Sequence, residues 1–140
     1  MNAHARVSAE IARLTPSLID VSHSIWEHPE LCFEEHHAHD LLCDMLEAHG
    51  LTPVRHAFGL DTAFVAEAGT TGPVVAVCCE YDALPDIGHA CGHNVIAAAG
   101  LGAGLAAAAV AEELEGRVRI LGCPAEEGGG GKVFMIREGA

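Results

Sequence analysis

The chain has 140 residues, half of them hydrophobic, which is enough to bury the core of one ordinary domain and excludes global disorder. Its formal net charge is −13, from seven Lys and Arg against twenty Asp and Glu. A field of that sign repels phosphates, so we expect no nucleic-acid partner and no anionic membrane surface as a partner.

Ten histidines and six cysteines are many for this length. His36, His37, His39 and His49 fall in one polar stretch, and we expect them to be solvated. The first residues lack the apolar core of a secretory signal, and the cysteines lie inside apolar patterns, as buried free thiols do. These features favour a reduced, cytoplasmic protein over a disulfide scaffold.

The first part of the chain predicts two helices. In residues 15–27, Thr15 is a candidate N-cap and Pro16 a candidate first helical residue. The side chains expected on one stripe of this helix are Leu18, Ile19, Ser22, Ile25 and Trp26. A second helix follows in residues 33–50, with Gly50 as its stop.

Strands then follow. Residues 62–69 alternate well enough for a strand, and residues 73–81 are valine-rich and apolar, as in a strand buried on both faces. Residues 95–111 form an unbroken run dominated by Ala and Gly, which we read as a buried core helix rather than a membrane span. A strand that starts at residue 117 and ends near Gly122, and a short helix near the end, complete the pattern, which predicts βαβ units in an α/β sandwich.

Two polar clusters follow neighbouring strands of this predicted sheet. One is residues 82–94, in the sequence YDALPDIGHACGHN, and the other is Glu126-Glu127. Ligands of open α/β sheets bind at the carboxyl ends of the strands, and a standard crossover would bring both loops to the same edge. The sequence therefore predicts one site built from both loops.

Cys91 and His93 carry the two side chains that zinc prefers. Gly92 allows the chain to turn between them, and a helix starting nearby would favour the thiolate form of Cys91. A buried cysteine beside a hydrogen-bonded histidine is the alternative for so short a match. In Glu126-Glu127, one carboxylate can bind a metal while the other accepts a proton. The alternative there is a solvated acidic pair, although the glycine run 128–131 indicates close backbone approach or a mobile loop.

Three motifs, WEHPELCFEE, YDALPDIGHACGHN and PAEEGGGGK, occur in the order and spacing of one known family. In them the chain resembles the amidohydrolase branch of metallopeptidase family M20. That branch includes aminoacylases, hippurate hydrolases, auxin-conjugate amidohydrolases and p-aminobenzoyl-glutamate hydrolases. The resemblance implies a three-layer α/β/α sandwich with a mostly parallel sheet, like the catalytic domain of zinc peptidases. It also implies metal-dependent hydrolysis of amide bonds in N-acyl amino acids, aminobenzoyl-glutamate conjugates or dipeptides.

By the same resemblance, Cys91, His93 and Glu127 match metal ligands and Glu126 matches the general base. Asp82 matches the acidic residue that supports the metal centre. Other branches have a histidine ligand two positions before that aspartate, where this chain has Glu80. His89 receives no role. The metal is divalent, with zinc favoured by the thiolate and manganese as the alternative, and the complete enzyme is expected to be dinuclear.

Family members are far longer, with a lid or dimerisation domain and two further histidine ligands. Residues 1–140 therefore resemble only the N-terminal part of a catalytic domain. We expect this chain alone to be inactive and prone to association, and the full-length protein to be a homodimer. The competing hypotheses are a non-catalytic metal-binding or scaffold remnant and a structural zinc module, which would need a second compact Cys/His pair.

Overall fold

The computed structural model describes residues 2–140. It contains a four-stranded sheet in the order β1-β2-β4-β3. The strands are β1 (Val54–Arg55), β2 (Phe64–Ala68), β3 (Val74–Glu80) and β4 (Arg117–Cys123). The helices are α1 (Ala3–Glu27), α2 (His36–Ala48), α3 (His93–Ala111) and α4 (Gly131–Arg137), and a 3-10 turn, η1, spans Ala57–Gly59.

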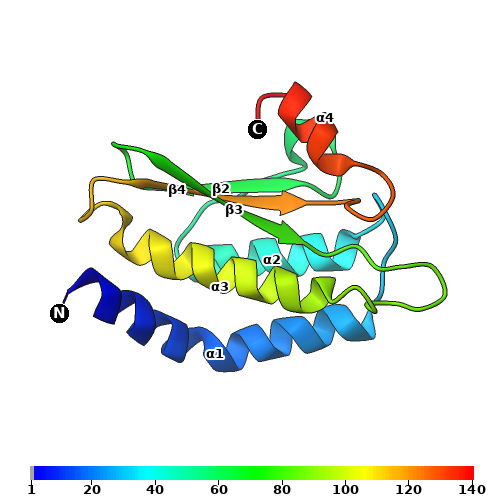
Figure 1. Ribbon diagram of the computed structural model, residues 1–140, viewed down its shortest axis with the longest axis horizontal. Coiled ribbons are helices and arrows are strands. Elements are labelled where there is room, and N and C mark those ends of the chain that lie inside the picture. Colours follow the sequence, from blue (N-terminus) through cyan, green and yellow to red (C-terminus); the bar gives the residue numbers. More distant parts are fainter. Residues whose placement is uncertain (1) are drawn as a thin grey trace.

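The elements form three layers. Helices α1, α2 and α3 lie on one side of the sheet and α4 lies on the other (Figure 1). The predicted α/β sandwich is therefore confirmed, but its sheet is mixed. β3 and β4 pair in parallel, whereas β2 runs antiparallel to both β4 and β1. The crossover β3–α3–β4 brings the carboxyl ends of both parallel strands to the right-hand edge in Figure 1.

Helix α1 begins at Ala3, thirteen residues before Pro16, the first helical residue that the sequence predicts. The Asn2 side chain caps it by accepting a hydrogen bond from the Ala5 amide at 2.9 Å. Thr15 instead donates its hydroxyl to the Ile11 carbonyl at 2.8 Å, within the helix. A proline inside a helix costs about 3 kcal/mol in isolation. Packing of α1 along α3 offsets that cost, and the local signal at Pro16 does not stop the helix.

The predicted stripe of α1 is partly wrong. Ile25 is fully buried, together with Leu14 and Val21, but Ile19 and Trp26 are half exposed. Among the histidines of α2, His39 is buried rather than solvated, because its ring lies near Phe64 and His56. Burial lowers the pKa of His39 below its usual range.

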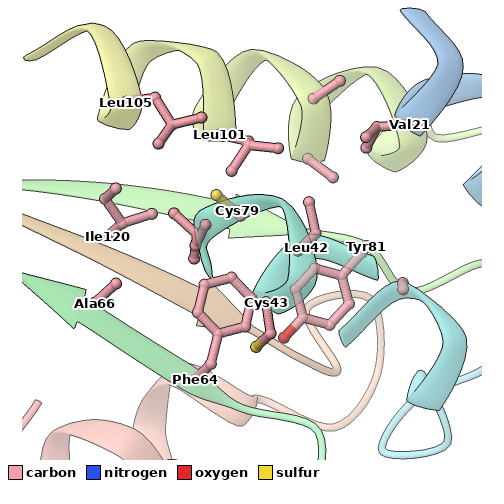
Figure 2. Packing of buried hydrophobic residues seen from close by; sticks show 14 of the residues in the cluster. Val21, Leu42, Cys43, Phe64, Ala66, Cys79, Tyr81, Leu101, Leu105 and Ile120 are labelled. Atoms are coloured by element: carbon pink, nitrogen blue, oxygen red, sulfur yellow. The ribbon is translucent and has the colours of Figure 1, made fainter. Parts of the chain in front are cut away.

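The core lies between the sheet and the helices α1, α2 and α3. Figure 2 shows Leu101 and Leu105 of α3 facing Ile120, Phe64 and Cys79 of the sheet. Helix α3 is long and apolar enough to cross a membrane, but 61% of its most apolar window is buried inside the fold, as in a core helix of a soluble protein. The helices and the sheet both contribute to this core, and its large buried side chains include Leu14, Ile25, Leu42, Phe64, Tyr81, Leu101 and Ile120.

The prediction that β3 is buried on both faces is wrong. β3 lies at an edge of the sheet, and Val74, Val75 and Cys78 are exposed. Only Cys79, which faces α3, is fully buried. An apolar sequence shows that a strand can be covered, but it does not show which elements cover it.

Candidate metal centre

The candidate site lies where β3 and β4 end. After β3, the chain turns through Leu84 and Gly88, which exchange two backbone hydrogen bonds, and reaches Gly92. Gly92 has φ +85°, a left-handed conformation that favours glycine, and it directly precedes the first residue of α3, His93. The predicted turn between Cys91 and His93 is confirmed. After β4, Pro124 and Ala125 lead into Glu126 and Glu127.

The structure brings Cys91, His93 and Glu127 together. One potential ligand atom from each, a thiol sulfur, an imidazole nitrogen and a carboxylate oxygen, lies within 4.8 Å of the other two. His93 is buried, Cys91 is partly buried, and the Glu127 side chain is 29% exposed. The convergence of the two strand-end loops, predicted from the crossover, is confirmed.

Asp82 organises this cluster from behind. Its backbone carbonyl lies 2.8 Å from His93 Nδ1 and accepts a weaker hydrogen bond from the Cys91 thiol at 3.7 Å. Since a carbonyl can only accept, Nδ1 of His93 carries a proton and donates it to Asp82. The carboxylate oxygen Oδ2 of Asp82 accepts the Glu127 amide at 2.9 Å. Asp82 thus contacts all three residues of the cluster: the side chains of Cys91 and His93 and the backbone amide of Glu127.

The face of His93 that carries Nε2 points at carboxylates. Glu80 Oε2 and Glu126 Oε2 each lie 3.7 Å from Nε2, and Glu127 Oε1 lies 3.9 Å away. Glu126 is the most exposed of the three, at 41% of its side chain. Several carboxylates so close together repel one another, and this arrangement is unfavourable unless a cation is present.

Lys132 supplies one cation. Its ammonium group forms an ion pair with Glu80. Burial by itself lowers the pKa of Lys132, but the hydrogen bond to Glu80 and the negative charge of Glu80 and Glu126 together outweigh burial, and the pKa is raised. The sequence identifies Glu80 only as a departure from a family pattern and gives Lys132 no role in the site. The signal available for Lys132 was its place after the glycine run, at the start of α4.

The thiol of Cys91 does not ionise readily in this setting. Burial and a hydrogen bond to Glu127 raise its pKa, and the backbone amide of His93 only partly compensates. The start of α3 does favour the thiolate, as expected, because the His93 amide lowers the pKa of Cys91, but the net pKa is raised. Burial and the neighbouring carboxylate outweigh the helix terminus, so a bound cation is needed to make the thiolate.

His89 lies in the same loop but outside the cluster. Its side chain is buried, and within the part of the chain that the structure describes neither ring nitrogen has a hydrogen-bond partner. Burial, followed by repulsion from His93, lowers its pKa. The structure gives His89 no place among the converging side chains.

The glycine run Gly128–Gly131 allows close approach of the backbone, which is one of the two interpretations that the sequence left open. A Cβ on Gly131 would lie 1.9 Å from the Pro124 carbonyl oxygen, and one on Gly129 would lie 2.5 Å from the Phe33 ring. A hollow of about 150 Å³ opens beside the run, lined by Glu126, Lys132 and Val133 among others. Glu126 therefore faces space that a small molecule can enter.

Sulfur, nitrogen and oxygen donors at the carboxyl ends of parallel strands define an α/β protein with a candidate metal centre of the metallohydrolase type. No protein-family model matches the chain. The chain is 43% identical to Xaa-Arg dipeptidase of Mus musculus over 96% of its own length. It is 39% identical over 86% of its length to one of the subunits of p-aminobenzoyl-glutamate hydrolase from Escherichia coli.

A solved structure from Bacillus subtilis, described as a dinuclear metal-binding peptidase of the M20 family, is similar throughout. Its TM-score is 0.79 at 30% identity, over 94% of this chain. The chain belongs to the amidohydrolase branch of metallopeptidase family M20. It spans 35% of the mouse dipeptidase, 29% of the Escherichia coli protein and 40% of the Bacillus chain.

Proposed function

We propose that the chain contributes one part of a metal-dependent amidohydrolase that cleaves amide bonds in N-acyl amino acids, aminobenzoyl-glutamate conjugates or dipeptides. The observation that carries this proposal is the convergence of Cys91, His93 and Glu127 within 4.8 Å. The activities for which the relatives are named, a dipeptidase and a p-aminobenzoyl-glutamate hydrolase, support the substrate class. Dimerisation of a longer protein and a cytoplasmic location belong to the same proposal, and the six free cysteines are compatible with a reducing compartment.

The donor set fits a divalent metal, with zinc favoured over manganese. Thiolate and imidazole are zinc ligands of first choice. The buried Oδ1 of Asp82 has no hydrogen-bond partner among residues 2–140, although it lies 2.9 Å from His93 Nδ1. A buried acceptor of this kind is costly unless positive charge lies nearby. Cys91, His93 and Glu127 would hold the metal, and Asp82 would orient His93 through Nδ1, as outer-shell acceptors do.

When bound, a divalent metal acts as a Lewis acid toward water and toward an amide carbonyl. Glu126 is the exposed carboxylate beside the cluster, and its Oε2 can accept a proton from water and deliver it to the leaving amine. Glu127 is held by its own amide on Asp82 and is less free to move. The Lys132–Glu80 ion pair keeps Glu80 at the cluster while balancing part of its charge.

The test separates the two glutamates. We expect Glu127→Gln and Cys91→Ala to weaken zinc binding to the chain by about tenfold or more, measured by competition with a chelating dye. Glu126→Gln should bind zinc nearly as the wild type does, because this carboxylate is assigned to proton transfer. In a full-length relative with matching motifs, the equivalent of Glu126→Gln should abolish turnover. Equal zinc loss in Glu126→Gln and Glu127→Gln would contradict the assignment.

The chain of 140 residues alone is expected to release no amine from N-benzoyl-glycine or p-aminobenzoyl-glutamate. It offers three candidate ligand side chains in one group among the described residues, which leaves a dinuclear centre incomplete. Clear turnover by a monodisperse monomer would show that these side chains suffice.

A further inference from the structure

The segment between α1 and α2, here the brace (residues 28–35), contains most of the motif WEHPELCFEE, which the proposed function leaves unused. Its first glutamate caps α2. The Glu30 carboxylate accepts hydrogen bonds from the amides of His37 at 2.8 Å and Ala38 at 3.0 Å. Glu35 stands at the N-cap position itself but makes no capping hydrogen bond. Because Glu30 performs the capping, the Glu35 carboxylate is free to point elsewhere.

Glu35 points into the interior, toward the candidate site. Its side chain is fully buried, and Oε1 accepts hydrogen bonds from the amides of Phe33 at 3.0 Å and Ala125 at 2.8 Å. Oε2 accepts the Thr62 hydroxyl at 2.7 Å. No cationic side chain among residues 2–140 pairs with it. Burying a carboxylate without a cation is expensive, so the three donors are what make the position tolerable.

Ala125 is the residue directly before Glu126. Its φ is +55°, a left-handed conformation that costs an alanine about 1–2 kcal/mol. Its amide is held by Glu35, and its carbonyl accepts the Gly131 amide at 3.2 Å. Such a conformation persists only where surrounding contacts determine it. The direction in which Glu126 and Glu127 leave the strand therefore depends on the bond to Glu35.

The brace also contacts the other loop of the site. The Glu30 carbonyl accepts the amide of Ala83 at 2.8 Å, next to Asp82. On the side of β4, the Phe33 ring lies so close to Gly129 that a Cβ there would approach it to 2.5 Å. One segment thus fixes both strand-end loops, from which all three candidate ligands come.

We propose that Glu35 is a positioning residue for the carboxylate pair: by accepting the Ala125 amide it sets Glu126 and Glu127 relative to Cys91 and His93. This inference rests on the proposed metal centre. Burial raises the pKa of Glu35, whereas the hydrogen bonds that it accepts from Thr62, Ala125 and Phe33 act in the opposite direction. Glutamine at this position keeps one oxygen for both backbone amides, and its NH₂ group can donate to the Thr62 hydroxyl oxygen.

Three variants test the proposal. Glu35→Met keeps the length of the side chain but offers no acceptor. Glu35→Gln keeps the acceptor for Ala125. Thr62→Val is the matched control, because it removes a hydrogen bond from the same buried group and leaves the Ala125 amide bonded. Two measurements are made on each folded variant: zinc affinity by chelator competition, and hydrogen exchange of the Ala125 amide by NMR.

We expect Glu35→Met to weaken zinc binding by about tenfold to a hundredfold, the range found for outer-shell partners. Its Ala125 amide should exchange faster than in the wild type. Glu35→Gln and Thr62→Val should retain the zinc affinity and slow Ala125 exchange of the wild type, even where Thr62→Val lowers the unfolding midpoint. A folded Glu35→Met chain with unchanged zinc affinity and slow Ala125 exchange would overturn the proposal.

Two further outcomes are also decisive. If Glu35→Met does not fold, slow Ala125 exchange in the wild type and in Glu35→Gln supports the proposal, and fast exchange in the folded wild type overturns it. If the wild type binds no zinc, the metal centre fails as a proposed function. Ala125 exchange in Glu35→Met then still reports whether Glu35 holds the loop, so the two failures are distinguishable.

Discussion

Cys91 and Cys78 are both free thiols near the carboxyl end of β3, but their surroundings differ. Cys78 is exposed on the edge strand, whereas Cys91 is partly buried and faces His93 and Glu127. Burial and Glu127 raise the pKa of Cys91, so the protein alone holds it as a thiol. A metal that displaces the proton would change the reactivity of Cys91 and leave that of Cys78 unaltered.

The two thiols therefore give an internal comparison. With zinc at about ten times its dissociation constant, we expect alkylation of Cys91 by iodoacetamide to slow by about tenfold, because about one site in eleven is free. Alkylation of Cys78 should be unchanged. Mass spectrometry of the digested chain measures both rates in one sample. Equal protection of the two cysteines, or none at Cys91, would count against Cys91 as a ligand.

At the scale of elements, α3 approaches β3 closely because it lacks side chains at key positions. A Cβ on Gly100 would lie 2.8 Å from the Cys78 carbonyl oxygen, which is backbone and cannot move aside. A Cβ on Gly102 would lie 2.6 Å from Leu18 Cδ1, the end of a flexible side chain on α1. The two glycines thus differ in whether the neighbouring atoms could move to make room for a Cβ.

We expect Gly100→Ala to lower the free energy of unfolding by about 1–3 kcal/mol through overpacking. Gly102→Ala should cost less, because Leu18 can rotate and alanine gains up to about 1 kcal/mol in helix propensity. Urea unfolding followed by circular dichroism measures both. Equal losses would mean that the approach of α3 to β3 is not limited by the Cys78 backbone.

The sequence predicts several elements well, and the misses have physical causes. The crossover rule places Cys91, His93 and Glu127 together because parallel strands share an edge. The early part of α1 is missed, because a local signal at Thr15 and Pro16 is overridden by packing against α3. Glu35 is missed because its bond to Ala125 joins residues 90 positions apart, and no local pattern encodes that pairing.

The whole molecule combines an open strand edge with a large negative charge. β3 offers unpaired backbone groups beside exposed Val74 and Val75, an arrangement that favours strand pairing between copies. The net charge of −13 opposes such pairing at low salt. Screening by salt removes the opposition, since repulsion between exposed charges is limited to about 10 Å at about 0.1 M.

We therefore expect the chain to associate as salt concentration rises, measured by light scattering during gel filtration. Val75→Lys should reduce this association, because a lysine on an edge strand disfavours pairing. Val54→Lys is the matched control: it adds the same charge to β1, an edge strand of only two residues. A similar effect of both substitutions would place the contact elsewhere, and a monomer under all conditions would contradict the expectation.

Ala125 closes a ring. Its amide is bonded to Glu35 and its carbonyl to the Gly131 amide, so the peptide from residue 125 to residue 131 returns to the residue from which it departs. The two glutamates therefore lie on one hydrogen-bonded loop that begins and ends at Ala125. A change in the backbone of this loop would therefore alter the surroundings of the proton acceptor and of the candidate ligand together.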